Sequence, residues 1–439
     1  MSNSFITYPK FSCALGAQQT VVAISNAVPI LHSGPGCGMK AGGLLSQGQG
    51  YAGGNTIPCT NADGNDVIFG GMKKLDVLIH NTFKIVNGDL YVVLTGCTSD
   101  IIGDDVQSVV KPYQALGKPI VYVETGGFKS NNYVSHSTVV NAIIDQYSDK
   151  YKESTEVEPG LVNVFASIPD QDPYFEGNLE ELKRILTGIG LKVNVLFGAL
   201  SEGVSEWRSI PNAQFNVVVG NWVNIPIVEH LKDLYGTPYV QYNHFPIGAQ
   251  QTSDFLRKVS EFGGLDKEKT EQFIEKEEKR FYAYLEHMAD FVLEFKYNTP
   301  RRFYTSVDAD YSIGLSKFLV NELGILPGKV FITDDTPEEY QQDIYKELEQ
   351  VSKYRSITPE FSVDGEWILD QILEEEKKDP YILFGSAWEE PAAKKDGACF
   401  IEIAPPIQFR MNLNTALIGY NGGLRLTEEI YSDALRFYQ

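Results

Sequence analysis

The chain has 439 residues and a formal net charge of −21, from 37 basic and 58 acidic residues. At about 150 residues per domain, this length predicts about three domains, and such an acidic surface disfavours nucleic acid and anionic membranes as partners. No apolar run reaches the ~20 residues of a membrane helix, and the first residues lack a signal-peptide pattern. We therefore expect a cytoplasmic protein that binds neither nucleic acid nor membranes.

The first third of the chain alternates apolar strand-like runs with glycine-rich turns. The run VVAISNAVPIL (21–31) precedes HSGPGC, and both DLYVVLTGC (89–97) and KPIVYVETGG (118–127) are strands followed by glycine. A polar stretch at 149–160 ends in Pro-Gly and predicts a linker. This predicts a first domain at residues 1–155.

The rest of the chain continues the alternation. A strand in LVNVFASIPD (161–170) precedes an amphipathic helix over 178–190, and a long charged helix over 266–296 is predicted to bridge two domains. We place a middle domain at 156–290 and a C-terminal domain at 291–439. Continuous apolar strands between helices are typical of parallel sheets covered on both faces, which is the α/β class. In such sheets, sites gather at the carboxyl ends of the strands.

Several common functional motifs are absent from the sequence. The two Gly-Lys pairs, at Gly117 and Gly328, are followed by Pro and Val, so no P-loop for ATP is present. No C-x-x-C occurs either, which argues against a zinc ribbon or a thioredoxin-like redox pair.

Three of the five cysteines share a sequence context. Cys13, Cys37 and Cys97 each lie at the end of an apolar segment beside glycine or small residues. If the strands are parallel neighbours, the loops open at one edge, and three thiolates would suit an iron–sulfur cluster. The residues alone leave open the alternative of buried, small hydrophobic side chains. Three ligands also leave a cubane one short, which implies a second chain or a ligand other than cysteine.

Polar residues near these cysteines have two interpretations each. Asp104 and Asp105 form either an acid–base pair or, as we favour, a polar helix end. His32 lies five residues before Cys37 and is either a hydrogen-bonding neighbour of the site or a core histidine.

The motifs HSGPGC, CTNADGNDVIFGGMKKL and VVLTGCTSDIIGDDV resemble the first domain of the nitrogenase component 1 superfamily. They are most similar to the β-type subunits of the molybdenum–iron, vanadium–iron and iron–iron proteins. The stretches YNHFPIGAQQTSDFLRKV and APPIQFRMNLNTALIGYNGGLRLTEEI resemble later parts of the same family, so the likeness covers nearly the whole chain.

This resemblance implies three Rossmann-like domains, with parallel sheets flanked by helices, in an α₂β₂ heterotetramer with an α-type component 1 subunit. It implies that Cys13, Cys37 and Cys97 bind an iron–sulfur cluster shared with that partner, of the P-cluster type ([8Fe-7S]) or a [4Fe-4S] cluster. It also implies an ATP-dependent iron–sulfur reductase protein as the electron donor. Cys59 and Cys399 are interpreted as structural.

The chain departs from the family at the residues that bind the catalytic cofactor. The α-type subunit holds that cofactor with a cysteine and a histidine, whose counterparts here are Gly220 and Ile418. The counterpart of an extra serine ligand in molybdenum-type β subunits is Gly127, and Cys13 comes early in the chain. These departures favour a vanadium-like, iron-only-like or nitrogenase-like reductase.

We therefore expect a β-type electron-relay subunit that has no catalytic residues of its own. One alternative is a scaffold subunit for assembly of a nitrogenase-type metal cofactor, and another is a small-molecule-binding protein with the fold but no cluster.

Overall fold

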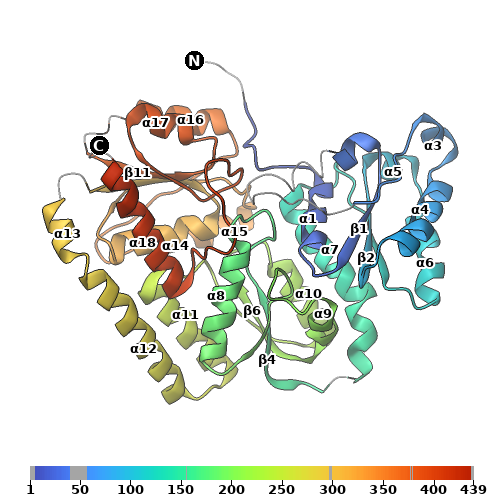
Figure 1. Cartoon of the computed structure of the whole chain (residues 1–439), viewed down its shortest axis with the longest axis horizontal. Coiled ribbons are helices and arrows are strands. Elements are labelled where there is room, and N and C mark those ends of the chain that lie inside the picture. The colour runs from blue at the N-terminus through green and yellow to red at the C-terminus, as the bar shows by residue number, and fades with distance from the viewer. Residues whose placement is uncertain are drawn as a thin grey trace.

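The computed structural model describes residues 5–39, 57–154, 156–295, 299–375, 377 and 379–436. Three sheets follow one another along the chain, and every strand pair in them is parallel. Helices pack around the sheets (Figure 1). The predicted α/β class is confirmed, whereas the boundaries of the three domains stay a prediction.

The first sheet has the order β1-β2-β3. Its strands are β1 Ala27–His32, β2 Leu90–Thr95 and β3 Ile120–Val123. The elements around it are η1 Ala14–Ala17, α1 Gln18–Val22, α3 Gly64–Phe69, α4 Met72–Ile85, α5 Cys97–Ile102, α6 Val106–Ala115 and α7 Asn132–Gln146. Every residue of the central strand β2 is buried, which explains its unbroken apolar sequence. Because His32 pairs with Thr95, β1 and β2 end side by side.

The second sheet has the order β5-β4-β6-β7. Its strands are β4 Glu158–Phe165, β5 Lys192–Asn194, β6 Ala213–Val219 and β7 Tyr239–Tyr242. The helical elements of this part of the chain are η2 Ser148–Ser154, α8 Phe175–Gly188, α9 Val204–Ser209, η3 Ile210–Asn212, α10 Ile225–Tyr235, α11 Gly248–Gly263, α12 Lys267–Glu286 and α13 Ala289–Glu294.

The third sheet has the order β10-β9-β8-β11-β12. Its strands are β8 Arg302–Val307, β9 Leu326–Ile332, β10 Glu360–Phe361, β11 Tyr381–Gly385 and β12 Cys399–Glu402. Its helices are α14 Ala309–Asn321, α15 Glu338–Glu349, α16 Gly365–Glu374, α17 Glu390–Asp396 and α18 Gly419–Arg436. One large hydrophobic cluster joins all three sheets, with Leu94, Val164 and Phe384 among its members, and smaller clusters pack on the first and third sheets.

Two predicted segments differ from the structure. The linker at 149–160 is largely structured, because η2 continues to Ser154 and β4 already begins at Glu158. A register shift after Glu158, at which Gly160 adopts a φ of +80°, lets the strand start early. The helix at 266–296 is two helices, α12 and α13. Its last buried residue in α12 is Phe281, and α13 buries none, so packing no longer supports a continuous helix there.

The chain before η1 joins the third sheet to the first. In Figure 1 this blue segment passes from the part of the molecule that carries α16 to the part that carries α1. Among the described residues, no helix has the length and apolar character needed to cross a bilayer.

Candidate metal centre

Cys97 lies where the central strand of the first sheet turns into a helix. Strand β2 ends at Thr95, Gly96 is the N-cap, and Cys97 is the first residue of α5. The Ser99 hydroxyl accepts the Gly96 N–H at 3.1 Å and fixes this turn. The Cys97 side chain is half-buried, and its Sγ accepts the Gly127 N–H at 3.1 Å.

Gly127 brings two of the predicted ligands together. A Cβ placed on it would lie 2.9 Å from Cys97 Sγ and 3.4 Å from Cys13 Sγ, so both sulfur atoms border one glycine. The same Cβ would lie 2.9 Å from Cys13 Cβ, which is closer than real side chains approach. The backbone at Gly127 therefore packs against both cysteines because this residue has no side chain.

Cys37 lies on a different element, within a helical turn at 35–39 after β1, and is exposed. Its thiol neighbour is Cys59, whose pKa is raised chiefly by burial and further by Cys37. Cys59 Sγ lies 3.5 Å from Ser33 O and accepts the Asn61 N–H at 3.4 Å. These backbone contacts agree with a structural role for Cys59.

Within the described residues, no group of three His, Cys, Asp or Glu side chains is arranged to hold a metal ion. The structure thus brings Cys13 and Cys97 together but does not bring Cys37 to them, and the three-ligand set stays a prediction. Cys399 is buried in the third sheet, where its thiol lies 3.8 Å from Ile430 O. Residues 40–56, which follow Cys37 along the chain, are outside the described part.

The carboxyl end of the first sheet, just after β1, also contains a polar group without a hydrogen-bond partner among the described residues. Ser33 Oγ is buried and has no hydrogen-bond partner among the described residues. It is so close to Gly96 that a Cβ there would lie 2.1 Å away. Two soft thiols, a glycine cradle and this free hydroxyl fit a sulfur-rich iron cluster, because such clusters take thiolate ligands and accept hydrogen bonds at sulfur.

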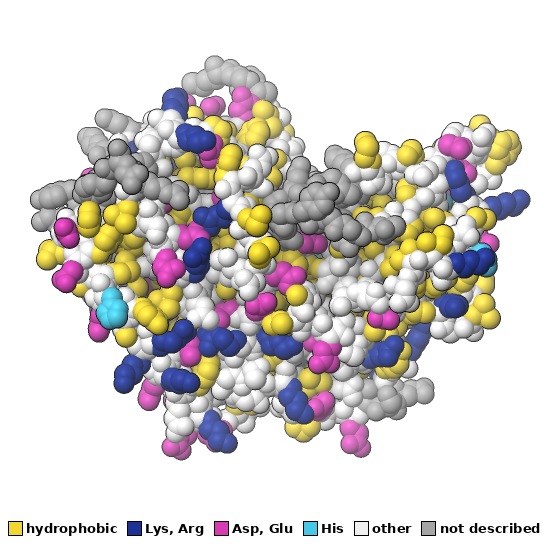
Figure 2. All heavy atoms as spheres, in the orientation of Figure 1, with side chains coloured by type: hydrophobic (Ala, Val, Ile, Leu, Met, Phe, Trp, Pro, Cys, Tyr) yellow, Lys and Arg dark blue, Asp and Glu magenta, His cyan; other side chains and the backbone are white. Residues whose placement is uncertain are grey.

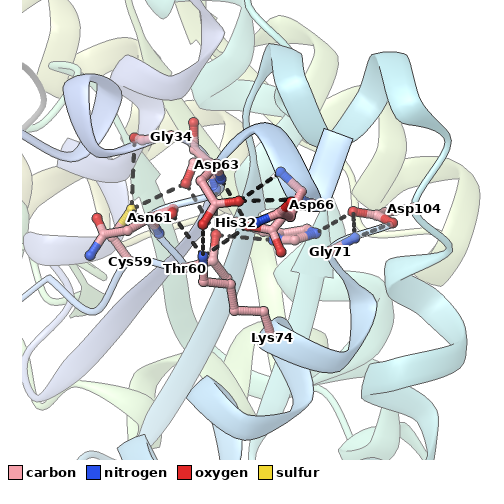
Figure 3. A network of polar contacts seen from close by, with 12 residues as sticks. His32, Gly34, Cys59, Thr60, Asn61, Asp63, Asp66, Gly71, Lys74 and Asp104 are labelled. Carbon is pink, nitrogen blue, oxygen red and sulfur yellow. Dashed lines mark hydrogen bonds and ion pairs between the residues drawn. The ribbon is translucent and has the colours of Figure 1, made fainter. Parts of the chain in front are cut away.

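His32 is held in a buried network beside this edge (Figure 3). Its Nε2 donates to Asp104 Oδ2 at 2.9 Å, and its Nδ1 lies 3.2 Å from Thr60 Oγ1. Burial lowers the pKa of His32, although Asp104 opposes the shift, so the ring is neutral at pH 7. Asp104 also accepts the Gly71 N–H at 3.0 Å with both oxygens. His32 is therefore both a core histidine and a link between β1 and the turn before α4.

Neither aspartate of the Asp104–Asp105 pair is placed for acid–base work. Asp104 is committed to His32 and Gly71, and Asp105 is the N-cap of α6, where it accepts the Ser108 N–H at 3.1 Å. The favoured interpretation of a polar helix end thus fits Asp105, while the role of Asp104 depends on His32.

The short helix α3 carries exposed apolar side chains next to this network. Asp63 and Asp66 form a capping box at its start, and Lys74 donates to Asp66 Oδ2 at 2.8 Å. Ile68 and Phe69 are 73% and 83% exposed, and Figure 2 shows hydrophobic side chains gathered over α3 at the upper right.

A second cluster of ionisable groups, which the sequence motifs did not predict, lies between the second and third sheets. Its four carboxylates line one cavity, which we call the acidic cavity: Asp172, Asp308, Asp310 and Asp334. The space open to the centre of a water-sized sphere is about 30 Å³, enough for about two water molecules. The signal was the aspartates directly after the apolar strands RFYTSV and KVFIT.

Gly220, the counterpart of the cysteine that holds the catalytic cofactor in α-type subunits, lies against the acidic cavity. Gly220 has a φ of +142°, and a Cβ there would lie 2.6 Å from Asp310 Oδ2. Asp310 Oδ1 accepts the Asn221 N–H at 2.7 Å. Ile418, the other counterpart, is fully buried in the core. The position next to Gly220 is thus filled by a carboxylate of this chain.

Comparisons with known proteins identify the family. Residues 12–435 match the family of nitrogenase component 1 type oxidoreductases. This chain belongs to that family. It is 25% identical, over 96% of its length and 82% of the relative, to the nitrogenase iron–molybdenum cofactor biosynthesis protein NifE of Methanococcus maripaludis. It is 24% identical, over 97% of its length and 93% of the relative, to the nitrogenase molybdenum–iron protein beta chain of the same organism.

A solved structure supports the fold. The chain superposes on a structure described as nitrogenase Cp1 at pH 6.5 with a TM-score of 0.78, at 20% identity, over the whole of this chain and 95% of the other. The predicted nitrogenase component 1 fold and the likeness to β-type chains are thereby confirmed.

Proposed function

We propose that the chain is a β-type electron-relay subunit that carries half of an iron–sulfur cluster of the P-cluster type. The observation that carries this proposal is the pair of thiols, Cys13 and Cys97, that border Gly127 at the open end of the first sheet. When bound, such a cluster supplies one-electron transfer at iron held by thiolates. Cys37 is the third ligand in this proposal.

The residues of this chain would hold and tune the cluster from one side. Cys13 and Cys97 supply sulfur ligands, and the Gly127 amide, already 3.1 Å from Cys97 Sγ, donates a hydrogen bond to that sulfur. Such donation favours the thiolate form and the more reduced cluster. The remaining ligands come from an α-type partner, because two or three thiols on one chain cannot complete the site.

The exposed apolar residues near this edge would receive the ATP-dependent iron–sulfur reductase. Helices α3 and α5 contact each other, Ile101 of α5 is 73% exposed, and Phe128, next to Gly127, is 61% exposed. Large exposed aromatic and aliphatic side chains are typical anchors of a protein interface. The Gly71–Asp104–His32 hydrogen bonds join the end of α3 to β1, so this docking surface and the Cys37 turn share one support.

The decisive experiment is anaerobic purification of the chain with its α-type partner, followed by assays of iron and acid-labile sulfide. We expect both to be present, and their absence would overturn the cluster. The Cys37→Ala variant should lose or alter the visible and paramagnetic spectra, and unchanged spectra would overturn the assignment of Cys37.

A scaffold for cofactor assembly is the second candidate, and the likeness to a cofactor biosynthesis protein favours it. The two functions differ in turnover with the iron protein and ATP. A complex that contains iron–sulfur but reduces neither dinitrogen, acetylene, protons nor thioethers would favour the scaffold. Retention of Cys13, Cys37 and Cys97 favours the electron relay.

The Phe69→Ala variant tests the docking surface. Because Phe69 is 83% exposed, we expect unchanged thermal stability and about tenfold weaker binding of the iron protein. Tyr354→Ala, at an 82% exposed position elsewhere, is the matched control. Equal binding by the Phe69→Ala variant and the wild type would place the docking surface elsewhere.

A further inference from the structure

The segment at residues 5–11 is anchored on the third sheet, although Cys13 belongs to the site at the first sheet. Its backbone pairs with the start of α16, where Tyr8 N donates to Val363 O and Gly365 N donates to Ile6 O, both at 2.8 Å. This attachment spans more than 350 positions of sequence.

The first side-chain anchor is Tyr8. Its ring is 1% exposed, and its hydroxyl donates to the Glu389 carboxylate at 2.7 Å and lies 3.1 Å from Ser386 Oγ. Because Glu389 is itself fully buried, it depends on such donors, and the loss of one leaves a buried carboxylate undersatisfied.

The second anchor is Lys10, whose side chain is fully buried. Its ammonium pairs with Asp308 and donates to Thr333 Oγ1 at 2.8 Å. Asp308 is one wall of the acidic cavity, where burial and then Asp308 raise the pKa of the neighbouring Asp334 and Lys10 opposes that shift. Asp308 is 27% exposed and also accepts from the Tyr133 hydroxyl at 2.9 Å, so loss of the ammonium releases segment 5–11 from this contact more than it strands a buried charge.

The chain then attaches at once to the first sheet's helix α7. Ser12 N donates to Asn132 Oδ1 at 2.8 Å, Asn132 N donates to Ser12 O at 3.1 Å, and Cys13 forms an antiparallel bridge with Asn131. Cys13 lies three positions after Lys10, a span of at most about 11 Å. The Cys13 backbone is thus held between contacts to the third sheet, through residues 5–10, and contacts to α7.

We propose that Lys10 is a positioning residue of the cluster site, which fixes the Cys13 backbone by tying segment 5–11 to Asp308 at the wall of the acidic cavity. This inference rests on the proposed function, in which Cys13 is a cluster ligand. It makes the acidic cavity a support of the metal centre on another sheet.

The test compares three variants in the chain purified with its α-type partner. Lys10→Met removes the ammonium and keeps the bulk, Lys10→Arg keeps the charge, and Lys377→Met is the control. Lys377 is 6% exposed and pairs with Asp396 on the third sheet. Hydrogen exchange is followed by mass spectrometry at residues 5–17, and the cluster by its paramagnetic spectrum and reduction potential.

For Lys10→Met we expect about tenfold faster exchange that extends through residues 12–17, with a shifted reduction potential. The Lys10→Arg variant should restore both, and the Lys377→Met variant should change neither. Faster exchange confined to residues 5–11, with an unchanged spectrum and potential, would overturn the proposal.

Tyr8→Phe serves as a milder second variant, because it removes one hydroxyl from the same segment and keeps the ring. It should accelerate exchange at residues 12–17 in the same direction but less, and a null result there would also count against the proposal. A wild-type complex without iron would overturn the electron-relay function instead. The exchange pattern at residues 12–17 would then still decide whether Lys10 positions Cys13.

Discussion

The acidic cavity and the cysteine-bearing end of the first sheet both lie at carboxyl ends of parallel strands. They differ in how many of their polar and thiol groups have partners within this chain. In the acidic cavity, each carboxylate has donors from the chain itself: Lys10 and Tyr133 for Asp308, Asn221 for Asp310, Trp222 and Thr336 for Asp334, and Tyr311 and Asn178 for Asp172. At the edge of the first sheet, Cys13 and Cys37 are exposed and Cys97 is half-buried. The carboxylates of the acidic cavity thus have hydrogen-bond partners within the chain, whereas the thiols at the first sheet are accessible to a partner.

The largest expected effect falls on the open edge. Cys97→Ala should reduce the iron bound per complex to less than about a tenth, because a lost thiolate removes a ligand that no neighbour replaces. Cys59→Ala, whose sulfur contacts backbone atoms, should keep the iron. Iron content by absorption spectroscopy checks both, and equal loss in the two variants would erase the distinction between them.

The next effect concerns the glycine between the two sulfurs. Gly127→Ala puts a Cβ 2.9 Å from Cys97 Sγ, so we expect iron content to fall by about half or more. The unfolding free energy of the metal-free chain should also fall, by about 1 kcal/mol or more, because Cys13 Cβ, 2.9 Å from the new Cβ, is fixed to the backbone and cannot rotate away. Chemical denaturation measures the second quantity. Full iron with a wild-type spectrum would mean that the backbone at this position does not face the cluster.

The acidic cavity should make the free energy of unfolding depend on pH. Burial raises the pKa of Asp172 to about 6, so the folded state favours the protonated acid. The associated stability is fully present below the ordinary carboxyl pKa and is lost as pH rises from about 4 to about 6, in total about 3 kcal/mol. Asp172→Asn cannot ionise, so its stability relative to wild type should rise by about that amount between pH 4 and pH 7. Parallel urea titrations check this, and a constant difference would contradict it.

The smallest expected effect comes from a second glycine-to-alanine substitution, made at Gly220 beside the acidic cavity. Gly220→Ala combines a positive φ with a contact of 2.6 Å to Asp310 Oδ2, and we expect a loss of about 2 kcal/mol in unfolding free energy. Iron content should not change. In the double variant with Asp310→Ala, part of the loss should return, and strict additivity in the double-mutant cycle would disprove the contact.

The sequence predicted much of the fold because unbroken apolar strands such as LYVVLT are buried on both faces and signal parallel sheets directly. It predicted that Cys13, Cys37 and Cys97 lie together, because each follows an apolar segment beside glycine or small residues. The structure brings Cys13 and Cys97 together at Gly127, and the three-ligand set stays a prediction. It did not predict the contact of Lys10, whose partner Asp308 lies about 300 positions away, or the acidic cavity, whose carboxylates come from positions 172 to 334, because periodicity describes only local neighbours. The break after α12 was missed because helical charge patterns do not report where tertiary packing ends.

The contact of Tyr8 with Glu389 has a consequence for synthesis of the protein. The two residues are 381 positions apart, so this anchor cannot form on the ribosome until nearly the whole chain has emerged. The first sheet, by contrast, is complete in sequence by Val123 and can fold early, as domains generally do during translation. The Tyr8 anchor of the segment before Cys13 therefore forms only after the third sheet, whereas the contacts of Ser12 and Cys13 with α7 are available as soon as α7 has been made.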